Sequence, residues 1–358
     1  MSAGETLTDR LAAQIAQDGP LTVAQYMTAC LHDPQHGYYA TRPALGERGD
    51  FITAPLISQM FGELIGVWVA SVWMQLGEPA SFQLVELGPG DGTLMADLLW
   101  AAGNAPGFSD AAEVWLVELS EPLREHQRDR LTPLAPRLRW AQSLDEVPGR
   151  ANTIFVSNEL LDCLPPRQFI RTAVGWAERV VGLDPQGGLR FGLVPSPQDA
   201  LPPDAPVGAI FERSPAQEAL GRILGQRIVN DGGAALLIDY GRAEPGFGDT
   251  LQALRQHAKL DPLANPGEAD LTVHADFPSV LAAAQAQGAA TAIISQAEFL
   301  ARMAIGQRAE ALARARPEKA GLIGRQLNRL IAADQMGELF KAACIHRPNA
   351  VPPAFESA

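Results

Sequence analysis

Short apolar runs alternate with amphipathic segments along most of this chain. Mainly apolar runs of five to eight residues are typical of strands that are buried on both faces. We expect such strands at 82–87, 114–119, 137–141, 151–157 and 234–241. Segments with a helical apolar period are expected as helices, among them 6–17, 21–31, 58–76 and 214–229. This alternation predicts an α/β protein with a doubly wound sheet.

The pattern changes between residues 167 and 212. Three short β-prone runs, separated by glycine turns, predict an antiparallel β insertion. They lie at 168–172, 178–182 and 189–194. We also expect a short helix at 250–259. The predicted organisation has four segments: an N-terminal helical region at 1–78, the first part of the α/β domain at 79–166, the insertion at 167–212 and the second part of the domain at 213–358.

The first predicted strand leads into a turn rich in glycine. Glu86 lies near the end of that strand, and glycines follow at Gly88, Gly90 and Gly92. The spacing is E-x-G-x-G-x-G, whereas the dinucleotide fingerprint is G-x-G-x-x-G. A structural turn without a ligand is an alternative of about even weight for a bare glycine triplet. The strand-end carboxylate favours a site, because a buried charge needs a partner such as a ligand ammonium.

Polar side chains also end three further predicted strands. They are Glu118, Asn158, Glu159, Asp239 and Tyr240. Because the carboxyl ends of parallel strands meet at one edge of a sheet, these side chains predict a single acidic crevice there. In doubly wound folds the acidic residue ending the second strand binds the ribose hydroxyls, a role open to Glu118. Each residue taken alone could instead cap a helix.

The amino-acid composition argues against several classes of function. The 358 residues carry a net charge of −13, so a nucleic-acid partner, which needs a basic face, is not expected. The three cysteines, Cys30, Cys163 and Cys344, are too scattered for a disulfide framework or a metal site. No apolar run is long enough to span a bilayer, and no signal or transit peptide is visible. A cytoplasmic location without membrane insertion is the expectation.

Six motifs occur together and in this order in one known family. They are Gly49–Pro55 (GDFITAP), Val85–Leu94 (VELGPGDGTL), Asn158–Asp162 (NELLD), Asp239–Gly241 (DYG), Pro266–Thr272 (PGEADLT) and Met336–Lys341 (MGELFK). The chain resembles, from about residue 21 to 345, the MidA-type family of class I methyltransferases, which use S-adenosylmethionine (AdoMet). That family includes the mitochondrial complex I assembly factor. The resemblance implies a Rossmann-like class I sheet.

The resemblance also implies a reaction and a set of site residues. The reaction is methylation of a protein arginine in the complex I subunit that carries the quinone site. The cofactor-binding residues would be Glu86, Gly88, Gly90 and Gly92 for the methionine end of AdoMet, Glu118 for the ribose and Thr53 in a covering loop. Asn158, Glu159 and Asp162 would be the catalytic residues facing the substrate. The chain departs from its relatives at Leu56, where Glu is usual, and at Cys163, where Ala is common.

Arginine methylation places definite demands on the substrate end of the site. A guanidinium stays protonated in water, with a pKa above about 12. A carboxylate pair, here Glu159 and Asp162, can hold its planar fork through two hydrogen bonds. An AdoMet-binding assembly chaperone remains the alternative function. A nicotinamide oxidoreductase is the third, weakened by the glycine spacing. An oligomer is compatible with the sequence.

Overall fold

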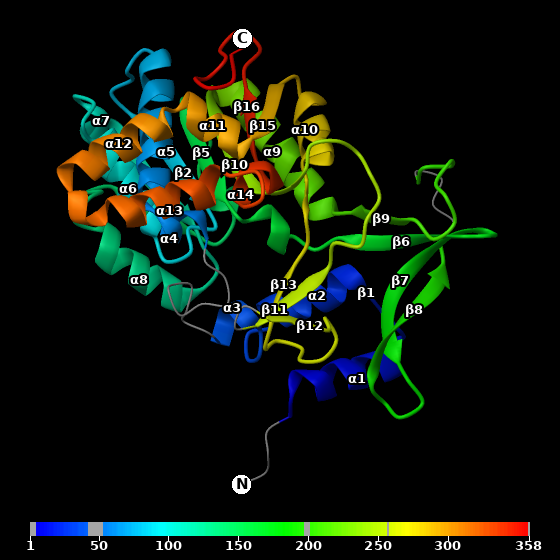
Figure 1. Cartoon of the computed structure of the whole chain (residues 1–358). Helices are drawn as coiled ribbons and strands as arrows, with labels where there is room; N and C mark the ends of the chain where they lie inside the picture. Colours follow the sequence, from blue (N-terminus) through cyan, green and yellow to red (C-terminus); the bar gives the residue numbers. More distant parts are fainter. Residues whose placement is uncertain (1–4, 42–52, 197–200, 256–257, 357–358) are drawn as a thin grey trace. The chain divides into compact units, whose positions relative to one another are not determined.

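The computed structural model of the chain describes residues 5–41, 53–196, 201–255 and 258–356 (Figure 1). It divides into two compact units, each assembled from three separate segments. The insertion unit comprises Met1–Pro43, Leu161–Gln217 and Glu244–Asp276. The central-sheet unit comprises Ala44–Leu160, Glu218–Ala243 and Phe277–Ala358. The four segments expected from the sequence stay a prediction.

The central sheet has the strand order β15-β16-β10-β5-β2-β3-β4. Its strands are β2 (Phe82–Leu87), β3 (Ala112–Val117), β4 (Leu138–Ala141), β5 (Thr153–Asn158), β10 (Gly233–Arg242), β15 (Ala290–Ser295) and β16 (Phe340–His346). All neighbours from β10 to β4 pair in parallel, whereas β16 is antiparallel to both β10 and β15. The predicted doubly wound α/β sheet is confirmed. The chain order reverses between β2 and β5, which is where ligands bind in open sheets of this kind.

The buried strands follow the apolar runs closely. Every residue of β2 and β5 is buried, as expected for strands covered on both faces. The expected strand 114–119 is wrong by two residues, because β3 begins at Ala112 and ends at Val117. Pairing of Ala112 with Phe82 extends the strand at its start. The pairing ends with Leu87 and Val117, and Glu118 therefore follows the strand instead of belonging to it.

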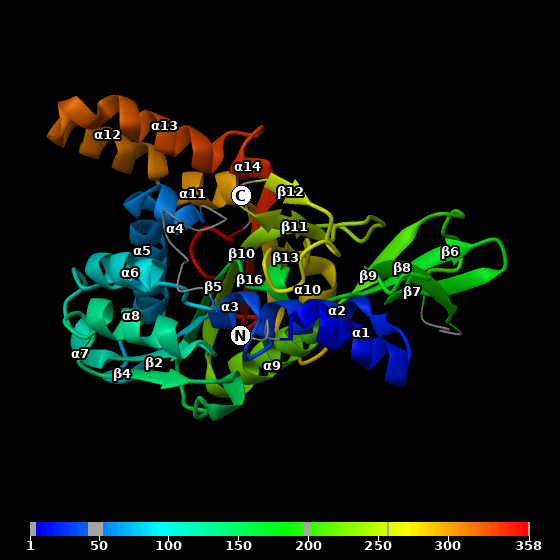
Figure 2. The same cartoon turned by 90° about the horizontal axis from the view of Figure 1, so that it is seen from below.

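Helices of the central-sheet unit surround this sheet (Figure 1). They are α4 (Ala54–Ile57), α5 (Gln59–Gln75), α6 (Thr93–Ala102), α7 (Phe108–Ala111), α8 (Glu121–Leu131), α10 (Phe277–Gln285), α11 (Gln296–Arg302), α12 (Ile305–Ala315), α13 (Ala320–Ile331) and α14 (Met336–Leu339), with the single turns η1 (Leu144–Glu146) and η3 (Pro317–Lys319). Helix α9 (Pro215–Asp231) begins in the insertion unit and continues into this one. In Figure 2, α12 and α13 lie side by side as a hairpin.

Close contact joins α5 to α6, the helix that follows the glycine turn. Helix α5 carries Gly66 opposite α6, and a Cβ atom there would lie 2.4 Å from the carbonyl oxygen of Leu98. A second glycine, Gly62, faces Asp97 of α6 in the same way. Only glycine permits the two helices to approach so closely. The two glycines therefore hold α6, and with it the end of the glycine turn, firmly against the core.

The insertion unit is built on antiparallel strands, which confirms the predicted insertion. One sheet contains β1 (Leu21–Thr22), β6 (Arg167–Thr172), β7 (Gly175–Leu183), β8 (Leu189–Pro195) and β9 (Ile210–Arg213). A smaller sheet contains β11 (Gln252–Arg255), β12 (Ala258–Leu260) and β13 (Asp270–Thr272). The remaining elements are α1 (Leu7–Asp18), α2 (Val23–His32), α3 (Tyr38–Thr41), η2 (Leu161–Cys163) and β14 (Ala275–Asp276).

The helix expected at 250–259 is wrong, because this segment forms β11 and β12 instead. Ala253 and Leu254 are both buried, and they pair with Leu271 and Asp270 of β13. Pairing with a strand distant in sequence therefore decides the conformation, and it overrides the local helical period.

Candidate active site

The turn between β2 and α6 is left-handed at each of its three glycines. Their φ angles are 66° at Gly88, 55° at Gly90 and 79° at Gly92. This conformation costs roughly 1–2 kcal/mol for a residue with a Cβ atom. A Cβ atom at Gly88 would also lie 3.0 Å from the Cδ1 atom of Leu160. The turn therefore presents bare backbone at the switch point of the sheet.

Glu86 is a buried carboxyl group at the end of β2. Its exposed fraction is 2%, and among the described residues its Oε2 atom has no hydrogen-bond partner. Burial, together with smaller contributions from the neighbouring carboxylates of Asp91 and Glu118, raises the pKa of Glu86 to about 8. The group is thus mostly neutral at pH 7. A cation brought to Oε2 would supply the missing partner and favour ionisation.

Glu118 lies beside the glycine turn, on the other side of β2 from β5. The backbone N–H of Gly88 donates to the carbonyl oxygen of Val117, 3.1 Å away, which places Glu118 next to the turn. Its Oε1 atom accepts a hydrogen bond from the backbone N–H of Ser120 at 2.8 Å. Burial raises the pKa of Glu118, while this hydrogen bond and that from Gln127 oppose the shift.

The end of β5 carries Asn158 and Glu159, next to the end of β2. Leu87 pairs with Ser157, so these residues follow directly at the same edge of the sheet. Glu159 has a φ angle of 52°, which is uncommon for a residue with a side chain. Its Oε1 atom accepts a hydrogen bond from Asn158 Nδ2 at 2.9 Å. In the described part of the chain the buried Oδ1 atom of Asn158 has no hydrogen-bond partner.

The short helix α4 is anchored at both ends. Its first backbone N–H, that of Ala54, donates to Oε1 of Glu159 at 3.2 Å. Its last carbonyl oxygen, that of Ile57, accepts a hydrogen bond from Gln326 Nε2 of α13 at 2.7 Å. Glu159 thus has a structural contact that the sequence did not reveal, because its partner is distant in the chain.

Thr53 precedes α4 in an extended conformation, and its side chain makes no capping hydrogen bond to that helix. The rest of the predicted covering loop, residues 49–52, lies outside the described residues. The role of Thr53 as a cover for the cofactor therefore stays a prediction.

The remaining predicted polar residues divide between the units. Asp239 and Tyr240 lie at the end of β10, where Asp239 Oδ1 accepts from the Tyr240 backbone N–H at 2.8 Å and the Tyr240 ring packs against Phe340. Asp162 is buried in η2 and belongs to the insertion unit. The structure therefore brings Glu86, the three glycines, Glu118, Asn158 and Glu159 to one edge of the central sheet, whereas Asp162 lies in the other unit.

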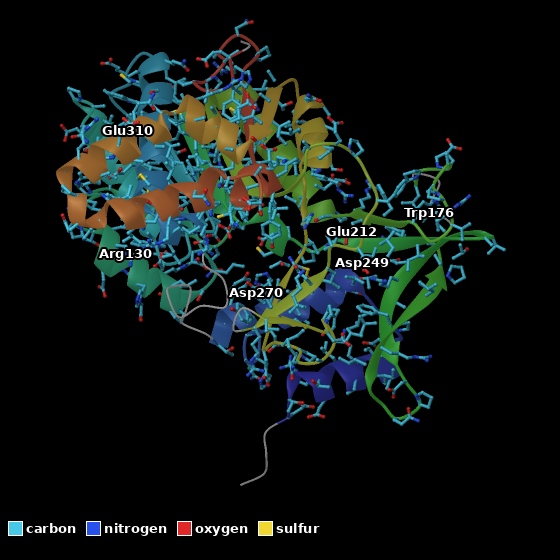
Figure 3. All side chains as sticks on the ribbon, in the orientation of Figure 1. Arg130, Trp176, Glu212, Asp249, Asp270 and Glu310 are labelled. Atoms are coloured by element: carbon cyan, nitrogen blue, oxygen red, sulfur yellow. The ribbon has the colours of Figure 1, made fainter. Side chains whose placement is uncertain are left out.

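Helix α8 contributes residues that sequence reasoning missed. Gln127 Nε2 donates to the carbonyl oxygen of Gly90 at 2.7 Å, and Arg130 forms an ion pair with Asp91 at 3.0 Å. Figure 3 labels Arg130 on this helix. The segment is strongly polar, and no spacing in it distinguishes these side chains from ordinary solvent-facing ones.

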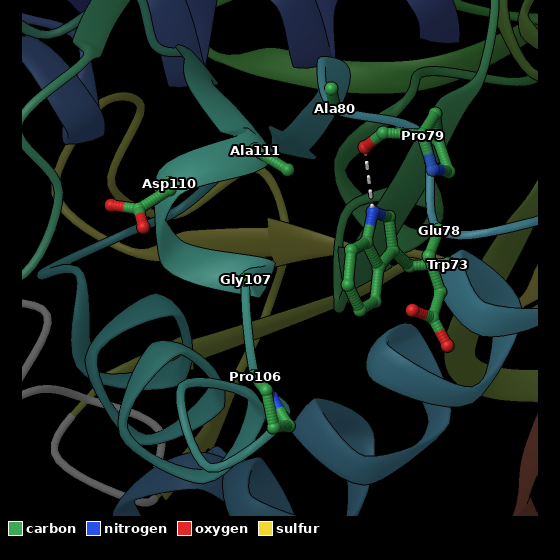
Figure 4. A pocket seen from close by; sticks show the side chains of 8 residues that line it. All are labelled: Trp73, Glu78, Pro79, Ala80, Pro106, Gly107, Asp110 and Ala111. Atoms are coloured by element: carbon green, nitrogen blue, oxygen red, sulfur yellow. Dashed lines mark hydrogen bonds between the residues drawn. The ribbon is translucent and has the colours of Figure 1, made fainter.

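A separate pocket of about 280 Å³ lies at the opposite edge of the sheet. It is lined by residues that precede β2 and β3 or flank them, namely Trp73, Glu78, Pro79, Ala80, Pro106, Gly107, Asp110 and Ala111 (Figure 4). Its Trp73 indole N–H already donates to the carbonyl oxygen of Pro79 at 3.1 Å. Ligands of open parallel sheets bind at the carboxyl ends of strands, so this pocket is not part of the candidate site.

The described residues contain neither a metal-binding cluster nor a membrane-spanning helix. Within 5–41, 53–196, 201–255 and 258–356, no three His, Cys, Asp or Glu side chains gather in an arrangement that could hold a metal ion. Over the same ranges, none of the helices combines the length and the apolar character needed to cross a membrane.

Comparisons with known proteins agree on one kind of chemistry. Residues 64–295 match the profile of a family described as S-adenosyl-L-methionine-dependent methyltransferases. The protein arginine methyltransferase NDUFAF7, mitochondrial, of Xenopus tropicalis is 35% identical over 376 aligned residues, covering 95% of this chain and 85% of that protein. Its human counterpart is 39% identical over 326 residues, covering 84% of this chain and 73% of that protein. A protein from Burkholderia thailandensis, whose crystal structure contains bound S-adenosyl-homocysteine, is 30% identical with a TM-score of 0.84, covering 98% of this chain and 93% of that one.

Proposed function

We propose, since the chain belongs to this family of S-adenosyl-L-methionine-dependent methyltransferases, that it transfers the methyl group to an arginine side chain of a protein. The enzyme class and the cofactor follow from family membership. The arginine substrate rests on the relatives of Xenopus and human, both of which are protein arginine methyltransferases.

The cofactor end of the proposed site is the glycine turn with its two carboxyl groups. The observation that carries this assignment is the buried Oε2 atom of Glu86, which has no hydrogen-bond partner among the described residues. The amino group of AdoMet would supply that partner, and bare backbone at Gly88, Gly90 and Gly92 leaves room beside it. Glu118 would accept the ribose hydroxyls. When bound, AdoMet supplies an electrophilic methyl group on its sulfonium.

The substrate end of the proposed site is the end of β5. The Oδ1 atom of Asn158, which none of the described residues hydrogen-bonds, and the carboxylate of Glu159 would accept N–H groups of a guanidinium. The Glu159 carboxylate is already oriented by Asn158 Nδ2 and the Ala54 N–H, so it would lose little freedom on binding. Asp162 stays a predicted third group that faces the substrate. Positioning of this kind contributes roughly 7–11 kcal/mol to reactions between two oriented partners.

The proposed partner is the subunit of respiratory complex I that carries the quinone site. This proposal rests on the resemblance to the MidA-type family, which includes the mitochondrial complex I assembly factor. A net charge of −13 suits an arginine-bearing partner, because opposite charge accelerates encounter.

Glu159→Gln tests the proposed reaction. The amide oxygen of Gln can accept the same two hydrogen bonds, from Asn158 Nδ2 and the Ala54 N–H, so the substitution removes mainly the charge. We expect S-adenosyl-homocysteine to bind with unchanged affinity in calorimetry, and transfer of labelled methyl groups to the client to fall by about 30-fold or more.

Glu125→Gln is the matched control, because Glu125 is exposed on the outer face of α8 and loses the same charge. It should bind and transfer as the wild type does. Equal transfer by Glu159→Gln and the wild type would remove Glu159 from the mechanism. A wild-type protein that binds S-adenosyl-homocysteine but transfers no methyl group would instead support an assembly chaperone.

A further inference from the structure

One face of α8 contacts the glycine turn and its neighbouring carboxyl group. Arg124, Gln127 and Arg130 recur at intervals of three residues, so they lie on the same side of the helix. Arg124 Nε donates to the carbonyl oxygen of Glu118 at 2.8 Å. Arg130 forms the ion pair with Asp91, inside the turn, at 3.0 Å. Gln127 lies between these two and has no exposed surface.

The amide of Gln127 has a defined orientation. The indole N–H of Trp140 can only donate, and it lies 2.8 Å from Oε1 of Gln127. The Nε2 group must therefore face the other way, where it donates to the carbonyl oxygen of Gly90 at 2.7 Å and to Oε2 of Glu118 at 3.4 Å. A single buried side chain thus connects the backbone of the turn with the carboxylate at the end of β3.

We propose that Gln127 is a positioning residue for AdoMet, because it fixes the glycine turn and the Glu118 carboxylate relative to one another. This inference rests on the proposed placement of the cofactor at the turn. A turn that is left-handed at three glycines has many conformations open to it in isolation. A side chain that holds the turn in one conformation reduces the conformational entropy that is lost when the cofactor binds. The hydrogen bond from Gln127 also favours the ionised form of Glu118 against the effect of burial.

Gln127→Met is the direct test, because Met has a similar length and suits a buried position but donates no hydrogen bond. We expect the Kd for S-adenosyl-homocysteine, measured by calorimetry, to rise by about tenfold or more. In steady-state assays the KM for AdoMet should rise while kcat at saturation and the KM for the client stay unchanged. A purely structural role would instead lower the active fraction, and so reduce kcat without a change in either KM.

Trp140→Phe serves if the first variant fails to fold. It removes the indole N–H that orients the Gln127 amide and keeps an aromatic ring in its place, and it should raise the Kd in the same direction by about threefold. Gln186→Met, at an exposed turn between β7 and β8, is the control for the chemical change and should leave the Kd unaltered.

Failure of the role of Gln127 and failure of the proposed cofactor site give different results. Folded Gln127→Met with a Kd within twofold of the wild type overturns the inference. If that variant is unfolded, an unaltered Kd in Trp140→Phe overturns it. A wild-type protein that does not bind S-adenosyl-homocysteine contradicts the proposed site itself.

Discussion

With the cofactor placed as proposed, Glu86 would link its binding to the release of a proton. The pKa of this buried carboxyl group is raised to about 8, above its ordinary value of 4.5. Below pH 8 the group is mostly protonated in the free protein, but an ammonium at its Oε2 atom pairs with the ionised form. Binding must then expel the proton, so the affinity must increase as the pH rises towards 8.

We therefore predict that S-adenosyl-homocysteine binds about tenfold more tightly at pH 7 than at pH 6, with release of close to one proton. Calorimetry in two buffers with different ionisation enthalpies measures that proton directly. Glu86→Gln should abolish both the proton release and the pH dependence. Binding by the wild type without proton release would show that Glu86 does not pair with the ligand amine.

At the scale of single residues, the sequence predicted the location of those candidate site residues that belong to a local pattern. Glu86 and the three glycines follow from the motif, and Glu118 follows from the end of the next strand. The contact of Glu159 with Ala54 and the bridging role of Gln127 could not be predicted. Both depend on side chains that meet only when distant segments of the chain fold together.

At the scale of elements, the glycine turn can be compared with a second turn in the same unit. Gly92 and Gly107 are each a left-handed residue directly before a helix, with φ angles of 79° and 84°. Gly92 precedes α6 at the proposed cofactor site, whereas Gly107 precedes α7 at the other edge of the sheet. A Cβ atom at Gly92 would lie 3.3 Å from Leu131, and one at Gly107 would lie 3.8 Å from Trp73.

Gly92→Ala and Gly107→Ala form a matched pair. Each should lower the free energy of unfolding by about 1–2 kcal/mol, because alanine is strained in this conformation. Only Gly92→Ala should weaken the binding of S-adenosyl-homocysteine, by about tenfold, since it displaces the turn against α8. Urea denaturation and calorimetry measure the two effects separately. Equal affinity in the two variants would place the cofactor elsewhere.

The elements that the sequence predicted best are those with a strong internal pattern. The parallel strands β2, β3, β4, β5 and β10 and the helices α5 and α9 follow from the apolar pattern. Strands β11 and β12 were missed because their conformation is set by pairing, of β11 with β13 on one side and with β12 on the other. The sequence of the segment carries no local signal of this pairing, so its apolar periodicity alone favoured a helix.

At the scale of the whole molecule, an ion pair attaches the α12–α13 hairpin to helix α5 within the central-sheet unit. Glu63 of α5 has an exposed fraction of 3%, and Arg308 of α12 donates to its two oxygens at 2.7 and 2.8 Å. Gln59 donates to the same carboxylate at 2.8 Å. The hairpin also carries Gln326, which holds the last turn of α4.

Arg308→Met should destabilise the protein by about 1–3 kcal/mol, because it leaves the buried carboxylate of Glu63 without its cation. Adding Glu63→Gln to this variant should recover part of the loss, since the unpaired charge is then gone. Urea denaturation of the wild type, both single variants and the double variant gives the coupling. Strictly additive effects would show that the pair contributes nothing beyond its two residues.

The division of the whole molecule into two units was not apparent from the sequence. The insertion unit combines three segments that are widely separated along the chain, including the N-terminal helices α1 and α2. Strand β1 has only two residues and joins this unit by pairing with β7. So short a strand has no periodicity of its own, and the segment was expected to be helical throughout.

The most direct test of the proposed function is the position of the transferred methyl group. Purified quinone-site subunit of complex I would be incubated with the wild-type protein and AdoMet carrying an isotopically labelled methyl group, then analysed by mass spectrometry. The proposed function predicts label on an arginine side chain, and at least about 30-fold less of it when Glu159→Gln replaces the wild type. Label on a different type of residue, or no label from a protein that binds S-adenosyl-homocysteine, would contradict it.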